Sequence, residues 1–148
     1  IQEIRKRYYS VDDKAFNAFG NFKISEQKIF LYFLCLKTYP IIFDFIFEVL
    51  IEKWLSLYEN ISTNDVLIFL DKKSSSHTEI DQLADTTKDK IASVLIRILK
   101  EVGIIYNGKI NALNATDDYW KYYVNINESW FLNACLLNKS ERDQIKNV

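Results

Sequence analysis

Residues 78–110 contain the pattern that most constrains how this chain can fold. Six aliphatic side chains recur there at the spacing of one helical face, and Gly103 follows them directly. These six side chains are Ile91, Val94, Leu95, Ile98, Leu99 and Val102. The pattern predicts a helix that starts after Thr86-Thr87, ends at Gly103 and turns this stripe towards the core.

A β-hairpin is expected directly after this helix. Asn107-Gly108 is the favoured pair for a two-residue hairpin turn, and β-prone residues precede it. We therefore expect strands over residues 104–106 and 109–110.

Two shorter helices are expected before the long one. Ser62 with Asp65, and Thr78 with Asp81, each place an acid three residues after a hydroxyl, which is the form of a capping box. A polar loop over residues 72–76 separates these helices. Helix, short helix, long helix and hairpin follow in the order of a winged helix-turn-helix, whose third helix enters the major groove of DNA.

The candidate DNA-binding side chains lie on the long helix opposite the stripe, at its N-terminus and in the hairpin. Asp89 and Ile96 flank that face, and Arg97 is expected to pair with Glu101. Backbone N–H groups at a helix N-terminus also favour phosphate. Protein binding is the alternative role of this module, because winged helices also mediate contacts between proteins. The candidate residues are Thr86, Thr87, Lys88, Lys90, Ser93, Arg97, Lys100 and Lys109.

Composition favours long helices around a substantial core. Three Gly and one Pro leave few helix breakers, and 49% of the residues are apolar. The net charge of −1 excludes DNA binding by bulk charge, so a DNA-binding role requires a local basic face.

The most apolar segment, residues 29–51, has the hydropathy of a membrane span. Four residues interrupt it, so no run reaches the roughly 20 residues that cross a bilayer. The four are Lys37, Pro40, Asp44 and Glu48. We expect two buried helices joined at Thr38-Tyr39-Pro40, and no membrane insertion.

These two helices are expected over residues 26–37, with Ser25 as N-cap, and over residues 41–58. The second should be covered on most sides. No His or Cys joins its acidic stripe at ligand spacing, so we interpret the stripe as a solvated edge paired with Lys or Arg. The stripe comprises Asp44, Glu48, Glu52, Ser56 and Glu59.

Further helices are expected at both ends of the chain. Residues 1–19 show mixed helical faces. Residues 117–124 are rich in aromatic side chains and predict a helix, with a strand as the second choice. Residues 127–137 predict another helix, and Ser140 with Asp143 predicts the cap of a last one.

The sequence contains no motif of an enzyme or a cofactor site. A Gly-rich phosphate loop, HExxH and GxSxG are all missing, so we expect no catalysis, no cofactor and no metal. The lone His77 is expected in a loop.

Cys35 and Cys135 lie in apolar surroundings, which favours buried, reduced thiols in a cytoplasmic protein. The chain begins at Ile1 and contains no Met, so we expect more sequence upstream.

The fold class expected from these patterns is mainly α, with a helical bundle body around a winged helix-turn-helix and its small β-hairpin wing. Residues 1–61 would form an N-terminal helical part, residues 62–113 the winged helix-turn-helix, and residues 114–148 a C-terminal helical part. At this length the three parts fit one compact unit.

The middle of the chain, about residues 24–138, resembles the BrxA family. The resemblance rests on YPIIFDFIFEVLIEKW (39–54), NDVLIFLDKK (64–73) and EIDQLADTTKDKIASVLIRILKEVGII (79–105). It continues more weakly through WFLNACLLNKSERD (130–143). The signal is an ordered set of segments at similar spacing. The family is a small non-enzymatic component of BREX phage-defence systems. It is also catalogued as an inner-membrane family of unknown function, a location that the interrupted apolar segment does not support.

This resemblance implies a helical body around a winged helix-turn-helix that binds double-stranded DNA, with other phage-defence proteins as partners. Thr86–Lys100 is the segment similar to the family's DNA-reading helix, and its cations suit that role. The alternative is a protein–protein adaptor that docks through the aromatic tract 119–123 and the apolar helix 41–58. Such an adaptor would bind another defence protein or a second copy of this chain, so the adaptor hypothesis includes a homo-oligomer.

Overall fold

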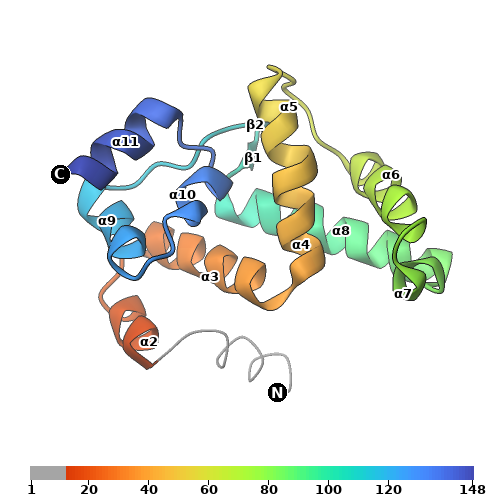
Figure 1. The fold of residues 1–148 in the computed structure, drawn as a ribbon, viewed down its shortest axis with the longest axis horizontal. Helices are drawn as coiled ribbons and strands as arrows, with labels where there is room; N and C mark the ends of the chain where they lie inside the picture. The colour runs from red at the N-terminus through yellow and green to blue at the C-terminus, as the bar shows by residue number, and fades with distance from the viewer. Residues whose placement is uncertain (1–12) are drawn as a thin grey trace. The chain divides into compact units, whose positions relative to one another are not determined.

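The structure, a computed structural model, describes residues 13–148 and is mainly helical with one small antiparallel sheet (Figure 1). This confirms the predicted α class. Packing divides the chain into two units, which we call the discontinuous unit (residues up to Asp44, with Ala112–Val148) and the inserted unit (Phe45–Asn111). The helices expected before Asp13 lie outside the described residues. The three-part division expected from the sequence stays a prediction.

The discontinuous unit is built around buried aromatic rings. The Phe33 and Tyr123 rings lie 5.2 Å apart, and Phe131 lies 5.1 Å from Phe33 and 4.7 Å from Tyr123. All three side chains are completely buried, and rings at these separations attract one another beyond their burial. The helices of this unit are α2 (Asp13–Phe19), α3 (Ile24–Thr38), α4 (Pro40–Phe45, crossing the boundary), α9 (Asp117–Asn125), α10 (Trp130–Ala134) and α11 (Lys139–Asn147).

The aromatic tract 119–123 forms the inner face of α9 and is not a docking surface. Tyr119, Trp120 and Tyr123 are all buried, so the expectation that this tract faces a partner is wrong. The Tyr119 and Tyr123 hydroxyls lie 2.7 Å apart, and Tyr119 also contacts the Glu26 carbonyl at 2.7 Å. Burial raises the pKa of both hydroxyls, so both stay protonated as part of the core.

The expectation of two helices in the apolar N-terminal half is confirmed. α3 ends at Thr38 and α4 begins at Pro40, so residues 29–51 form two helices. Within residues 13–148 no single helix is both long and apolar enough to cross a bilayer. Ile24–Thr38 and Pro40–Leu55 reach that length and composition only when they are taken together, and the two are bent by 106° relative to each other. Cys35 and Cys135 are buried thiols, and burial raises the pKa of the Cys135 thiol.

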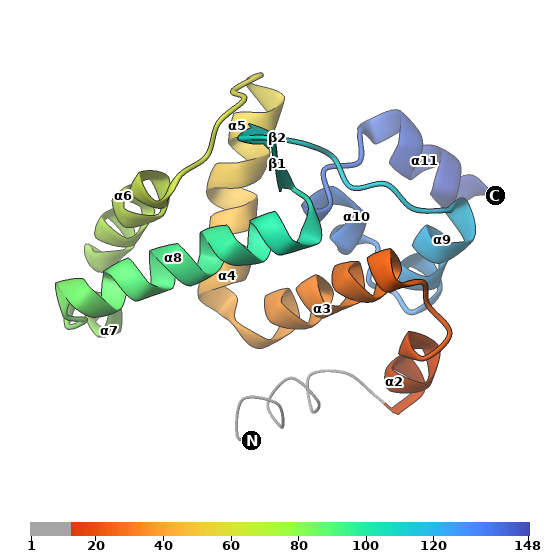
Figure 2. The same ribbon diagram turned by 180° about the vertical axis from the view of Figure 1, so that it is seen from behind.

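In the inserted unit, α6 and α7 lie by the N-terminal part of α8 and the hairpin follows its C-terminal end (Figure 2). Its core contains Leu70, Leu95 and Leu99, with the Phe45 and Phe69 rings 5.4 Å apart. Its elements are the π-helical turn η1 (Ile46–Leu50), α5 (Ile51–Leu55), α6 (Thr63–Ser74), α7 (Thr78–Asp81), α8 (Asp85–Val102), β1 (Ile105–Tyr106) and β2 (Lys109–Ile110).

Three helices have other bounds than expected. The helix predicted over residues 41–58 stops at Leu55 and contains the π-helical turn, and much of its surface is only half-buried. α6 continues through Ser74, into the segment expected to be a loop. The helix predicted over residues 127–137 is only Trp130–Ala134, because the chain turns left-handed at both Asn127 and Leu136.

Caps also differ from the sequence expectation. α3 starts before Ser25, because the Glu26 carboxylate accepts a hydrogen bond from the Lys23 N–H at 2.9 Å. His77, not Thr78, occupies the N-cap position of α7, without a side-chain capping bond, and its position outside the helices is confirmed. The N-cap of the last helix is Asn138 instead of Ser140, because Asn138 and Glu141 form a reciprocal capping box with bonds of 2.8 and 2.9 Å.

The predicted capping box at the start of α6 is confirmed and carries a pH-dependent part of the stability. Asp65 accepts the Ser62 N–H at 2.8 Å and contacts the Lys53 ammonium at 2.7 Å. Partial burial alone would raise the pKa of this carboxyl, but hydrogen bonds from Lys53 and Ser62 and the Lys53 charge hold it below its usual range.

We expect Asp65→Asn to lower the free energy of unfolding by about 1 kcal/mol at pH 7, the usual worth of a cap with a screened ion pair. The folded pKa is lowered, so the stabilisation is present above the unfolded value of about 3.9 and is lost as pH falls further. Urea unfolding of both proteins at pH 7 and at about pH 2.5 measures this. A difference that persists unchanged at the lower pH would contradict the assignment.

Candidate nucleic-acid interface

Helix α8 begins three residues earlier than the sequence predicts, at Asp85 instead of after Thr87. Ala84 is its N-cap and Asp85 its first residue, so Thr86 and Thr87 are exposed first-turn residues and do not precede the helix. No side chain caps this end. Asp85 places a negative charge where the helix dipole favours one, which competes with an incoming phosphate.

The buried face of α8 is rotated from the predicted stripe. It consists of Ala92, Leu95, Ile96 and Leu99. Ile96 was expected to flank the cationic face and is only 7% exposed, whereas Val94 was expected in the core and is 43% exposed. The prediction from periodicity treated every large aliphatic side chain as equally suited to the core. The fold instead turns the small Ala92 inwards and leaves Val94 towards solvent.

Four of the predicted residues line the outer face of α8, and all four are exposed: Lys90, Ser93, Arg97 and Lys100. Arg97 pairs with Glu101 at 3.9 Å, as expected for an exposed i,i+4 pair. Within residues 13–148, Lys90 and Lys100 make no ion pair with a carboxylate within 4.0 Å. Their charges are therefore available to a ligand.

The two remaining predicted cations already face carboxylates. The Lys88 ammonium lies 3.8 Å from Asp71 of α6, and its side chain is only 13% exposed. Lys109 of β2 lies 3.1 Å from Glu59, and both side chains are more than half exposed. Lys88 thus lies partly against α6, while Lys109 remains at the surface.

The predicted hairpin is confirmed. Ile105 pairs with Ile110 and Tyr106 with Lys109, and the turn residues Asn107 and Gly108 have φ values of 50° and 72°. Positive φ at both positions is what a type I′ turn requires, which explains the Asn-Gly pair.

Sequence reasoning missed the segment that extends this hairpin. The Ile110 N–H donates to the Glu59 carbonyl at 2.7 Å, so the chain just before α6 lies along β2. Asn111 also donates to the Ile104 carbonyl at 2.7 Å, which closes the base of the hairpin. A single backbone bond of this kind leaves no signature in the side-chain pattern.

The acidic stripe of the helix before α6 does not assemble a metal site. Glu48 is exposed and pairs with Lys73 of α6 at 2.6 Å, as expected for a solvated edge, and Glu52 is also exposed. Over residues 13–148, no three His, Cys, Asp or Glu side chains come together in a geometry that could hold an ion.

Known sequences match much of this chain. The profile of the BrxA family matches residues 1–117. A protein of Bacillus cereus (strain H3081.97) described as "BREX protein BrxA" is 30% identical over 101 residues, which are 68% of this chain and 50% of the relative. The chain thus spans about half the length of that relative. No solved structure matches. The family profile covers well over half of the chain, and the chain belongs to the BrxA family.

Proposed function

We propose that this chain binds double-stranded DNA through the outer face of α8 and the β1–β2 hairpin. The observation that carries the proposal is the set of exposed cations on α8 opposite its buried face, of which Lys90 and Lys100 lack a carboxylate partner among residues 13–148. Such cations contribute to DNA affinity mainly by releasing counterions from phosphates.

The order of elements supports a winged helix-turn-helix as the binding module. α6, α7 and α8 are followed by the hairpin, and α8 packs on α6 through its buried face. The Glu59–Ile110 bond adds an extended segment to the hairpin before α6, so that the wing has a third short member. In modules of this kind the last helix enters the major groove and the wing contacts the neighbouring backbone.

The available side chains favour backbone contacts over base reading. Lys90, Arg97 and Lys100 are suited to phosphates, and Thr86 and Ser93 can donate hydroxyl hydrogen bonds to phosphate or to base edges. Lys88 and Lys109 must exchange Asp71 and Glu59 for phosphate, so each adds less than a free cation. We therefore expect weak sequence selectivity.

A salt titration tests DNA binding itself. With about four phosphates neutralised, the logarithm of the association constant should fall with the logarithm of salt concentration at a slope of about −3 to −4. Fluorescence anisotropy with two unrelated duplexes of equal length, each at several salt concentrations, gives this slope. Similar affinities for both duplexes are expected. Absence of binding at about 50 mM salt, or a slope near zero, contradicts the proposal.

We further propose that the chain is a non-enzymatic, cytoplasmic accessory protein of a BREX-like phage-defence system, with other defence proteins as partners. Its place in the BrxA family and the printed name of the Bacillus cereus relative support the system. An adaptor that docks through residues 119–123 is not proposed, because that tract is buried.

A further inference from the structure

Helix α5 ends in a motif whose left-handed residue is a leucine. The Tyr58 N–H donates to the Lys53 carbonyl at 2.9 Å and the Leu57 N–H to the Trp54 carbonyl at 3.2 Å, the two bonds of a Schellman motif. Leu57 has a φ of 60°, in the region that favours glycine and disfavours any residue with a Cβ. Local sequence therefore works against this conformation.

The Leu57 side chain gains little from its own chain. Leu136 holds the same position in the motif that ends α10, with a φ of 64°, but it is only 1% exposed and packs in the core. Asn127, which ends α9 at a φ of 61°, belongs to a residue type that tolerates this conformation. Leu57 is 87% exposed. A leucine that is both disfavoured and solvated points to a contact with another molecule.

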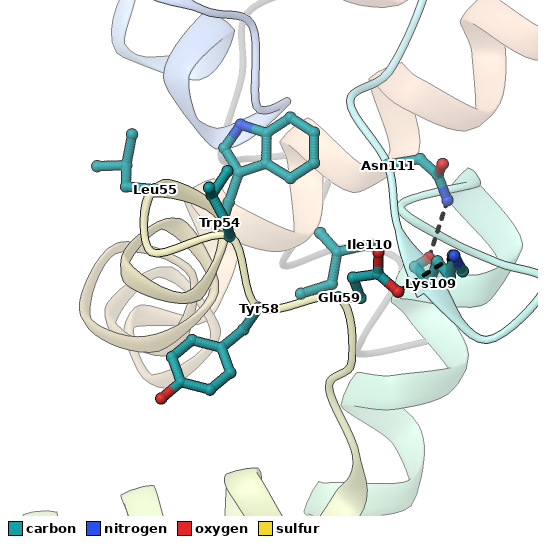
Figure 3. A pocket seen from close by; sticks show the side chains of 8 residues that line it. Trp54, Leu55, Tyr58, Glu59, Lys109, Ile110 and Asn111 are labelled. Atoms are coloured by element: carbon teal, nitrogen blue, oxygen red, sulfur yellow. Dashed lines mark hydrogen bonds and ion pairs between the residues drawn. The ribbon is translucent and has the colours of Figure 1, made fainter.

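A pocket lies beside this leucine, between the end of α5 and β2 (Figure 3). Its volume is about 610 Å³, and Trp54, Leu57 and Ile110 supply apolar lining. Figure 3 shows Leu55 and Tyr58 projecting from the helix end in different directions, and these side chains are 69% and 65% exposed. We call Leu55, Leu57 and Tyr58, together with this pocket, the α5 tip. The three exposed apolar side chains of the α5 tip also form part of the wall of this pocket.

The charges at the pocket rim indicate the occupant. Glu59 and Lys109 both line the pocket, and their charged groups lie 3.1 Å apart. One negative and one positive charge sum to zero, so the pocket rim favours a partner whose own charges are equally balanced. A second copy related by a two-fold axis presents the same pair in reverse, so Glu59 of each copy can face Lys109 of the other.

We propose that the α5 tip is a self-association surface that pairs two copies of this chain about a two-fold axis. Leu57 of each copy fills the pocket of the other, and the Glu59 and Lys109 side chains pair across the axis. An isologous interface needs a surface complementary to itself, and knob, hollow and opposite charges together meet that condition. The patch is small, so the dimer is weak, with a dissociation constant of about 10–100 μM.

Sedimentation velocity of the full chain between about 5 μM and 1 mM tests this, since that range brackets the expected dissociation constant. The average mass of the wild type should rise from 17.5 kDa towards twice that value. Leu57→Gly should stay monomeric throughout, with an unfolding temperature unchanged or raised, because glycine accepts the left-handed conformation. Ile68→Ala, which removes another exposed aliphatic side chain on α6, should associate like the wild type.

A charge exchange distinguishes a second copy from any other occupant. Glu59→Lys and Lys109→Glu should each stay monomeric alone, because like charges then meet across the axis. Mixed in equal amounts, the two variants should form a heterodimer, because a positive rim then meets a negative rim. Monomeric wild type at 1 mM overturns the proposal, as does undiminished association of Leu57→Gly or a mixture that stays monomeric. No DNA is present in these measurements, so their outcome is independent of the proposed function.

Discussion

Replacing Leu99 with alanine is expected to lower the free energy of unfolding by about 2–5 kcal/mol. Leu99 is completely buried on the inner face of α8, so the substitution removes dispersion contacts and leaves a cavity in the inserted unit. Val94→Ala is the matched control, because it shortens an aliphatic side chain on the same helix at a position that is 43% exposed. Its effect should stay within about 0.5 kcal/mol. Urea unfolding followed by the helical circular dichroism signal gives both values.

The pair of substitutions also tests the orientation of α8. Both residues belong to the aliphatic stripe that the sequence predicts as the core face, whereas only Leu99 is buried in the structure. Equal costs at the two positions would restore the predicted face and contradict the structure. A large cost at Leu99 alone would place the cationic face where the structure has it, away from α6.

Features set by a few neighbouring residues could be predicted from the sequence. The Asn107-Gly108 turn follows from the need for positive φ at both positions, and the end of α8 at Gly103 follows in the same way, since its φ is 99°. The capping box of Ser62 and Asp65 is equally local. In each case the conformation restricts which residue type fits, so the residue type indicates the conformation.

Competing local signals could not be ranked without the structure. Asn138 and Ser140 are both good N-caps two residues apart, and only the reciprocal bonds with Glu141 show which one starts α11. The left-handed helix ends at Leu57 and Leu136 could not be predicted, because leucine disfavours that conformation. Tertiary packing stabilises Leu136 there, and sequence patterns do not contain that information.

The sequence predicts which cations of the candidate interface are exposed, but it does not predict which of them already pair with a carboxylate. Helical periodicity places Lys90, Arg97 and Lys100 outside, and all three are exposed. Periodicity gives no information about side chains on other elements, so the Lys88–Asp71 and Lys109–Glu59 pairs appear only in the structure. DNA binding is therefore best tested at Lys90, Arg97 and Lys100, which lie on the same face of α8.

Replacing both Lys90 and Arg97 with alanine is expected to weaken duplex DNA binding on the order of 50-fold at 0.1 M salt, because each lost phosphate contact removes about 0.9 from the salt slope. The difference should shrink towards 1 M salt, where counterion release no longer contributes. Both residues are exposed, so the fold should be unaffected. The double variant Lys139→Ala, Lys146→Ala removes the same two charges from exposed positions on α11 and serves as the control.

The most direct measurement is the slope of the logarithm of the association constant against the logarithm of salt concentration, compared among these three proteins on one duplex. The wild type and the α11 control should share one slope, and the α8 variant should be less steep by about two units. Equal slopes and affinities for all three proteins, or an equal loss in the α8 and α11 variants, would contradict the claim that the outer face of α8 binds DNA.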